Sequence, residues 1–401
     1  GNANVGHKDI VTLMNEMPKP HQKLLAFNKI YYEINKKYGF KAANRWLELE
    51  WTKALYMHDA NTSTFKPYCY SYDLKRLAEE GLFFIEGFNA EPPKHLVTFV
   101  DFLKEFVSFA SNRSSGACGL PNLIPYMYYF WDRDVKAGYY TESPDKYARQ
   151  NIQRFIYAIN QPYVRDGIQS AFTNTSVFDR PYLEALFGGA EFPDGAFMID
   201  ELDGIMDFQK IYMEVMSDIR SKNMFTFPVS TISLLVQKGE CDLNTLDGFI
   251  DKEFAEWAIK HNMIWSDSNL FIDDSVTSLS NCCRLKSNIK DLGYFNSIGG
   301  SALKVGSVKV STVNLARIAL EHNTSEKEYL VALRDMVELN CKALDVVRSI
   351  IARNVEKGLL PNFKHGLVDF EHLYNTVGII GIYETMKAFG YTREDEFGNV
   401  F

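Results

Sequence analysis

The sequence predicts an α/β protein, and three observations support that prediction. The segment MFTFPVSTISLLV (224–236) is a nearly continuous apolar run rich in β-branched residues, which is typical of a strand buried on both faces. A second segment, SVKVSTVNL (307–315), is also predicted to be a strand. Stretches with helical periodicity separate the strands along the chain, and strands separated by helices indicate a sheet covered by helices.

The first part of the chain, residues 7–57, is predicted to be helical because apolar residues recur there at three- and four-residue spacing. An aromatic segment with strand character follows it. In order, the elements expected in the first half are helices at 21–36 and 40–58, a strand within 61–74, helices at 94–111, 120–135 and 143–161, and a strand at 171–178.

The second half continues the alternation of helices and strands. In order, we expect a helix at 199–221, the strand at 224–236, a helix at 251–262, a strand at 269–273, a polar loop, the strand at 307–315, and helices at 324–356 and 371–389. No linker, low-complexity stretch or internal repeat divides the chain, so one continuous domain over 1–401 is predicted.

Composition and charge exclude several classes of protein. The 401 residues include 43 basic and 51 acidic side chains, and an acidic chain without a basic block is not expected to wrap DNA. No stretch approaches the roughly 20 apolar residues that span a bilayer, and the N-terminus lacks the features of a secretory signal. The six cysteines form no CxxC, and no HExxH occurs. We therefore expect a reduced, cytoplasmic protein that holds no metal by itself.

Four short segments are candidates for carrying the chemistry. KPYCYSYDL (66–74) has one cysteine among tyrosines, and NCCRL (281–285) has two adjacent cysteines in a polar loop. The other two are MFTFPVSTISLLV (224–236) and SVKVSTVNLARIAL (307–320), in which a strand runs directly into a helix. Each segment alone is weakly specific, whereas the four in this order form a specific combination.

In this order the segments resemble the anaerobic (class III) ribonucleoside-triphosphate reductases. NANV near the start and TVGIIGIYETMKAFGY (376–391) also resemble family segments, so the resemblance covers almost the whole chain. It implies a ten-stranded α/β barrel of two half-barrels, incomplete in this chain, with a central finger loop at about 274–290. Helices at 1–60 would precede the barrel part at 61–401. The implied activity is the anaerobic reduction of ribonucleoside triphosphates to 2′-deoxyribonucleoside triphosphates by thiyl-radical chemistry.

The resemblance assigns roles to two cysteines. In the family, the finger-loop cysteine that becomes a thiyl radical most often directly precedes an arginine, which indicates Cys283 rather than Cys282. That radical would take a hydrogen atom from C3′ of the ribose, after which the 2′-hydroxyl leaves as water. Cys69 matches a strand cysteine that would supply a reducing equivalent or stabilise a sulfur-centred intermediate. Either thiol could instead be a small buried hydrophobe, and Cys282 and Asn281 are auxiliary candidates.

Polar strand residues are weaker candidates. Asn174, Thr175, Ser176, Ser230 and Thr231 would line the barrel and orient the ribose, or would satisfy backbone groups at strand ends. The glycine-rich segment 297–306 lacks the spacing of a phosphate-binding loop and is interpreted as a flexible loop.

Ser307 stands where formate-using relatives have an asparagine. The resemblance therefore puts formate in doubt as the electron donor, and favours a thiol reductant such as a thioredoxin- or glutaredoxin-like protein.

The resemblance also implies partners. No ATP-cone segment precedes NANV, and no RVCGY-like glycyl-radical segment or four-cysteine zinc site occurs, so we expect a truncated chain or one piece of a split enzyme. The glycyl radical, installed by a radical-SAM activating enzyme, would come from the missing C-terminal segment or from a partner chain. ATP and deoxynucleoside triphosphates are expected as specificity effectors. Helices between 94 and 161 would supply the effector site and the face of a homodimer.

Two alternatives remain open. A glycyl-radical lyase of the pyruvate formate-lyase type also uses adjacent cysteines on a finger loop, but it would bind a 2-keto acid rather than a nucleoside triphosphate. The second alternative is a non-catalytic nucleotide-binding subunit of a split reductase, although such a subunit would not need Cys283 and Cys69.

Overall fold

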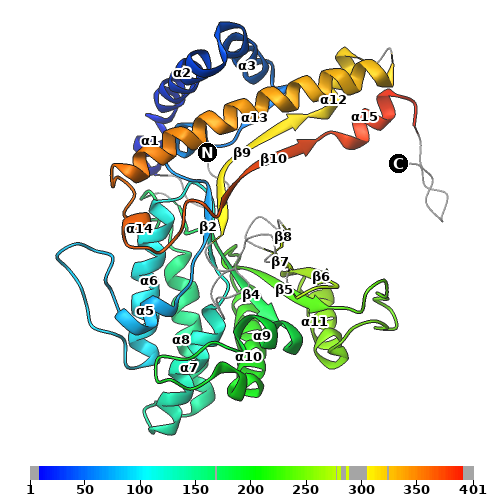
Figure 1. The fold of residues 1–401 in the computed structure, drawn as a ribbon. Coiled ribbons are helices and arrows are strands. Elements are labelled where there is room, and N and C mark those ends of the chain that lie inside the picture. Colours follow the sequence, from blue (N-terminus) through cyan, green and yellow to red (C-terminus); the bar gives the residue numbers. More distant parts are fainter. Residues whose placement is uncertain are drawn as a thin grey trace. The chain divides into compact units, whose positions relative to one another are not determined.

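The computed structural model describes residues 9–167, 169–276, 278–280, 286–288, 305–322 and 325–391 (Figure 1). The chain divides into two compact units that each combine distant parts of the sequence. The first unit consists of Gly1–Asn15, Cys69–Gly306 and Pro361–His372. The second unit consists of Glu16–Tyr68, Ser307–Leu360 and Leu373–Phe401.

The first unit is built on a curled sheet of five parallel strands. Each strand pairs in parallel with the next one along the chain. The strands are β2 (Cys69–Ser71), β3 (Cys118–Leu120), β4 (Thr173–Phe178), β5 (Val229–Leu235) and β6 (Ser268–Asp273). Parallel neighbours need crossover connections, and helices occupy the connections here. This sheet corresponds to one half-barrel of the predicted fold and confirms the α/β class.

Some helices of the first unit begin at a capping side chain. Ser143 accepts the backbone N–H of Lys146 at 3.2 Å, and Pro144 occupies the first position of its helix. The longer helices are α6 (Leu96–Asn112), α7 (Leu123–Lys136), α8 (Pro144–Ile159), α10 (Leu202–Arg220) and α11 (Lys252–Trp265). The short ones are α1 (Ile10–Glu16), α5 (Lys75–Glu80), α9 (Arg180–Phe187), the 3₁₀ turn η1 (Met198–Glu201) and α14 (Pro361–Lys364).

The second unit packs helices against a smaller sheet. Strand β1 pairs antiparallel with β9, and β10 also pairs with β9. The strands are β1 (Leu55–Met57), β9 (Gly306–Asn314) and β10 (Leu373–Ile380). The helices are α2 (Lys19–Tyr38), α3 (Phe40–Thr52), α4 (Ala60–Ser63), α12 (Leu315–Glu321), α13 (Glu326–Glu356) and α15 (Ile382–Ala388). Ion pairs of Arg353 with Glu33 and of Lys37 with Asp345 tie α13 to α2.

One predicted element is wrong, and another ends early. The helix predicted at 371–389 is a strand, β10, followed by the short helix α15, because LYNTVGII pairs with β9 and Gly381 (φ 81°) turns the chain between them. The helix predicted at 40–58 ends at Thr52. Lys53 adopts a left-handed conformation (φ 63°), which stops the helix and lets 55–57 form β1.

The predicted finger loop is described only in part. Its backbone contributes two short strands, β7 (Ser278–Ser280) and β8 (Lys286–Asn288), which pair antiparallel. Asn281, Cys282 and Cys283 lie outside the described residues, as does most of the predicted loop at 297–306. Among the helices that are described, none combines the length and the apolar character needed to cross a membrane.

Candidate active site

The strand register divides the half-barrel into two chemically different faces. Successive side chains in a strand point to opposite faces, and aligned residues of neighbouring parallel strands share a face. The register aligns Ser71 with Gly119 and Gly119 with Asn174. We call the face that carries them the polar face. Gly119 lies between Ser71 and Asn174 on this face. The polar residues of the face are Cys69, Ser71, Asn174, Ser176, Thr231, Ser233, Asn269 and Asp273.

The opposite face packs against helices, and we call it the helix face. Tyr70 and Tyr72 lie on it with ring centroids 5.5 Å apart, and the Tyr72 ring meets Phe106 of α6 at 5.2 Å. Burial raises the pKa of both phenols well above the ordinary value. Cys118 aligns with Tyr70 on this face, and burial also raises the pKa of its thiol well above the ordinary value. Cys118 therefore stays protonated and acts as a small core residue.

Asn174 is the best-defined polar group of the polar face. Its Nδ2 donates to the carbonyl of Val229 at 2.9 Å and to Thr231 Oγ1 at 3.2 Å. A carbonyl can only accept a hydrogen bond, so this contact fixes which end of the amide is the NH₂ group. Within the described ranges, Oδ1 accepts no hydrogen bond, although only 5% of the residue is exposed. Asn174 thus holds an acceptor in a defined orientation on the polar face.

The structure separates the five polar strand candidates. Asn174, Ser176 and Thr231 stand on the polar face, whereas Thr175 and Ser230 align with each other on the helix face. Thr175 Oγ1 donates to the carbonyl of Leu120 at 3.2 Å. The Ser230 hydroxyl is sealed and finds no hydrogen-bond partner in the described part of the chain.

Cys69 stands on the polar face, two positions before Ser71 on β2. Only 1% of its surface is exposed. Its backbone is approached closely by Gly306, since a Cβ at that position would lie 2.1 Å from the carbonyl oxygen of Cys69. Glycine is therefore required where the chain enters β9. Sequence analysis missed Ser71, Gly119 and Asn269, which only the strand register groups with Asn174.

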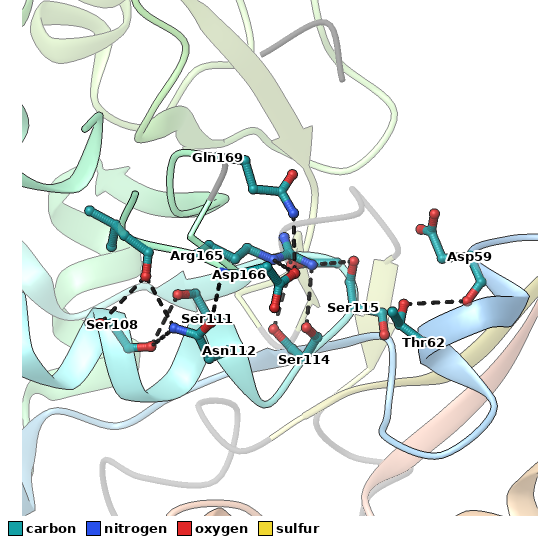
Figure 2. Close-up of polar contacts among 12 residues, drawn as sticks. Asp59, Thr62, Ser108, Ser111, Asn112, Ser114, Ser115, Arg165, Asp166 and Gln169 are labelled. Atoms are coloured by element: carbon teal, nitrogen blue, oxygen red, sulfur yellow. Dashed lines mark hydrogen bonds and ion pairs between the residues drawn. The ribbon is translucent and has the colours of Figure 1, made fainter. Parts of the chain in front are cut away.

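A buried arginine holds the segments that lead into β3 and β4 (Figure 2). The Arg165 guanidinium is 3% exposed and donates to the carbonyls of Gly116 at 2.9 Å, Ser114 at 3.3 Å and Ser115. Its plane also lies over the Phe172 ring, 4.5 Å from the centroid. These contacts join the loop before β3 to the residues before β4, and so they help to place Gly119 beside Asn174.

In the second unit, Ser307 is a buried residue near the start of β9. Its hydroxyl lies 2.9 Å from Thr376 Oγ1 of β10 and donates to the carbonyl of Lys309 at 3.3 Å. Only 1% of Ser307 is exposed. Thr376 was missed because its segment was predicted to be helical.

Lys309 is the most unusual titratable group of this unit, with an exposed fraction of 0%. Its Nζ donates to the carbonyl of His58 at 2.6 Å and to Ser63 Oγ. Burial lowers the pKa of Lys309 to about 7, against the smaller opposing effects of the Asp59 and Glu50 carboxylates. Burial likewise raises the pKa of Glu50 to about 7.

An aromatic cavity of about 500 Å³ opens between α6, α8 and the loop that joins α7 to α8 in the first unit. Tyr139 and Tyr140 line it together with the amide of Asn151 and the guanidinium of Arg154. The Tyr139 ring stacks on His95 with 3.7 Å between centroids, and Asp134 holds the His95 ring at 2.7 Å. Elsewhere in the described ranges, no group of three or more His, Cys, Asp or Glu side chains could hold a metal ion.

Comparison with known families identifies the chain's relatives. The family model for anaerobic ribonucleoside-triphosphate reductase matches residues 15–400. The chain belongs to this family. No curated protein matches it. The reductase fold is also found in solved structures of the anaerobic ribonucleotide reductase from Thermotoga maritima, to which this chain is about 40% identical.

Three of these structures show how far the similarity extends. The T. maritima complex with dATP and CTP is 40% identical with a TM-score of 0.85, and the match covers 97% of this chain and 62% of that one. The form with citrate in the active site is 40% identical with a TM-score of 0.84, and the match covers 97% of this chain and 67% of that one. The form with dATP in the specificity site is 39% identical with a TM-score of 0.85, and the match covers 97% of this chain and 63% of that one. This reductase-family chain therefore spans about 62% of the length of the first relative.

Proposed function

We propose that this chain binds a ribonucleoside triphosphate on the polar face and takes part in its reduction to the 2′-deoxyribonucleotide. The observation that carries the proposal is Asn174, whose Oδ1 faces the same side of the sheet as Cys69 and has no hydrogen bond within the described ranges. A ribose hydroxyl could donate to this oxygen. The T. maritima relative that was solved with dATP and CTP supports a nucleotide ligand.

Cys283 is proposed to abstract the hydrogen atom from C3′ of the ribose. A glycyl radical, installed by a radical-SAM activating enzyme, would take the hydrogen atom of the Cys283 thiol, which leaves a thiyl radical on the sulfur and restores the glycine. Cys69 would then supply a reducing equivalent or stabilise a sulfur-centred intermediate, with Cys282 and Asn281 in auxiliary roles. Asn174, Ser176 and Thr231 would orient the ribose, because hydroxyls and amides in such pockets fix the orientation of a ligand.

We propose a thiol protein of the thioredoxin or glutaredoxin type as the reductant. Ser307 and Thr376 present two hydroxyls that already bond each other, and no amide is offered at position 307 to hold formate. Two thiols supply two electrons and two protons, so that the 2′-hydroxyl leaves as water and the reductant becomes a disulfide. Turnover with a reduced dithiol but not with formate is the expected result, and turnover with formate alone would overturn this part.

The aromatic cavity of the first unit is proposed to hold a nucleotide effector. Tyrosine rings can stack on a base, Asn151 can hydrogen-bond its edge, and Arg154 can approach a phosphate. One T. maritima relative was solved with dATP bound in its specificity site. Tyr139→Ala should weaken dATP binding without weakening CTP binding. We further propose that the protein is cytoplasmic and acts as a homodimer together with the chain or segment that carries the glycyl radical.

The test of the proposed function is anaerobic CTP reduction by the activated holoenzyme, measured as dCTP formed. Asn174→Ala should lower kcat/KM at least tenfold, since it removes the oriented acceptor. Thr173→Val is the matched control, because it removes a sealed hydroxyl on the helix face of the same strand. Equal turnover by Asn174→Ala and the wild type would refute the assignment. Binding of a 2-keto acid instead of CTP would favour the lyase alternative.

A further inference from the structure

We propose that Asn362 is a positioning residue for Cys69, which it holds from the opposite face of β2 through the phenols of Tyr70 and Tyr72. We call Asn362, Tyr70 and Tyr72 the amide–phenol cluster. The inference rests on the proposed function, because it names the group that orients the strand cysteine which that function uses.

Strand β2 presents its two faces to different surroundings. Cys69 stands on the polar face, whereas the next residue, Tyr70, stands on the helix face, where Tyr72 follows directly after the strand. Both tyrosines have an exposed fraction of 0%, and their ring centroids are 5.5 Å apart. Because neighbouring side chains share one backbone, a group that fixes the two tyrosines also fixes the direction of the Cys69 thiol.

Asn362 of α14 is the polar group that meets these phenols. Its exposed fraction is 0%, and the ring of its neighbour Phe363 lies 5.8 Å from that of Tyr70, measured between centroids. Burial raises the pKa of both phenols, and the amide of Asn362 opposes part of this rise by hydrogen bonding, so it lies beside both of them. Asn362, Tyr70 and Tyr72 all belong to the first unit, so the amide–phenol cluster lies within one compact unit.

The cluster is polar at a place where apolar side chains would also fill the core. Both phenol oxygens and both polar atoms of the Asn362 amide are sealed, and none makes a hydrogen bond of ordinary geometry within the described ranges. Burying polar groups without good hydrogen bonds costs free energy, and replacing all of them together by apolar groups can be neutral or stabilising. Buried polar groups can instead fix one arrangement of the elements that they join. The cluster therefore orients β2 rather than adding to the stability of the fold.

The backbone around Asn362 is itself held on the first unit. Arg76 of α5 donates to the carbonyl of His365, three residues after Asn362. The carbonyl of Asn362 accepts the backbone N–H of Leu367 at 3.0 Å, which closes the turn that follows α14. The Asn362 amide thus projects from a backbone that is fixed on both sides, as a group that orients other side chains requires.

Steady-state CTP reduction by the activated holoenzyme tests the positioning role. Asn362→Leu removes the amide, so kcat for dCTP formation should fall at least about tenfold, because misplacing a reacting group by about 1 Å can cost about 100-fold. KM for CTP should stay within about twofold, since the helix face does not meet the substrate. Asn340→Leu is the matched control, because its amide on α13 is equally buried and sealed, and it should leave kcat unchanged. Equal kcat for Asn362→Leu and the wild type would overturn the proposal.

The triple variant Tyr70→Phe/Tyr72→Phe/Asn362→Leu separates positioning from stability. It leaves no sealed polar atom in the cluster, so its melting temperature should equal or exceed that of the wild type. Its kcat should nevertheless fall as far as that of Asn362→Leu. A stable triple variant with the kcat of the wild type would refute the positioning role, because the cluster would then only fill the core.

Hydrogen exchange of backbone amides provides a readout that needs no activity. In the assembled enzyme, Asn362→Leu should speed exchange in the peptide that contains Cys69 and leave exchange in the peptide of β5 unchanged. If exchange in the Cys69 peptide does not respond, Asn362 does not hold β2 and the proposal is wrong. If it responds while the wild type forms no dCTP, the proposed function fails and the hold of Asn362 on β2 stands.

Discussion

Replacing Lys309 with methionine should change how the stability of the protein depends on pH. In the folded protein burial lowers the pKa of Lys309 from 10.5 to about 7. The unfolded chain therefore binds more protons than the folded chain between about pH 7 and 10.5, and the free energy of unfolding rises with pH in that window. At about 1.4 kcal/mol per pKa unit, the shift corresponds to an upper limit of about 5 kcal/mol.

The measurable quantity is the difference in unfolding free energy between the wild type and Lys309→Met. Below pH 7 the buried charge of Lys309 destabilises the wild type, although hydrogen bonds to His58 and Ser63 offset part of this cost. The unfolding free energy of Lys309→Met should therefore exceed that of the wild type by the largest amount below pH 7. That advantage should shrink by about 1.4 kcal/mol for each pH unit above 7, until it is gone or reversed. Glu50 also titrates near pH 7, so the slope is best measured from pH 8 to 10.

Urea unfolding followed by tryptophan fluorescence at constant ionic strength provides the assay. Exposed Lys41 on α3 is the matched control, and Lys41→Met should show no comparable slope. If the difference in unfolding free energy between the wild type and Lys309→Met stays constant from pH 8 to 10, Lys309 keeps its ordinary pKa in the folded protein and the prediction is wrong.

Further predictions concern a helix cap and a close approach. Asp179 caps α9 by accepting the backbone N–H of Tyr182 at 3.1 Å, and it also accepts that of Leu235 at 2.6 Å, so Asp179→Ala should cost about 1–2 kcal/mol in urea unfolding. Burial raises the pKa of Asp179 from 3.8 to about 6, so the folded chain binds more protons than the unfolded chain between about pH 4 and 6. The contribution of Asp179 to the free energy of unfolding therefore falls as pH rises through that window, and Asp179→Asn should remove this pH dependence. Gly306→Ala would press a methyl group against the carbonyl of Cys69 and should cost about 1–3 kcal/mol; an unchanged melting temperature would contradict this.

Much of the fold could be predicted from periodicity, and the failures have physical causes. The run at 224–236 contains β5, and its largely apolar, β-branched composition fits a strand whose five central residues are all buried. The segment 371–389 was predicted wrongly because its apolar spacing fits a helix, whereas pairing with β9 makes its first half a strand. Strand β3 has only three residues, too few for any periodic pattern.

Only some residues of the candidate site could be predicted from the sequence, and their arrangement could not. The composition of the strands indicated Asn174, Ser176 and Thr231, yet it could not separate them from Thr175 and Ser230, because alternation depends on knowing the strand and its register. Ser71 and Gly119 gave no pattern of their own. The strand register alone places them beside Asn174 on the polar face.

We propose that this family member performs thiyl-radical chemistry from Cys283 on a ribonucleotide held by the polar face. The most direct measurement compares Cys283→Ser with the wild type in the activated holoenzyme, recording dCTP formation and CTP binding on the same samples, with the exposed thiol of Cys341 on α13 replaced as the control. Cys283→Ser should form no dCTP while it binds CTP as the wild type does, and Cys341→Ser should remain active. Sustained dCTP formation by Cys283→Ser would contradict the proposal.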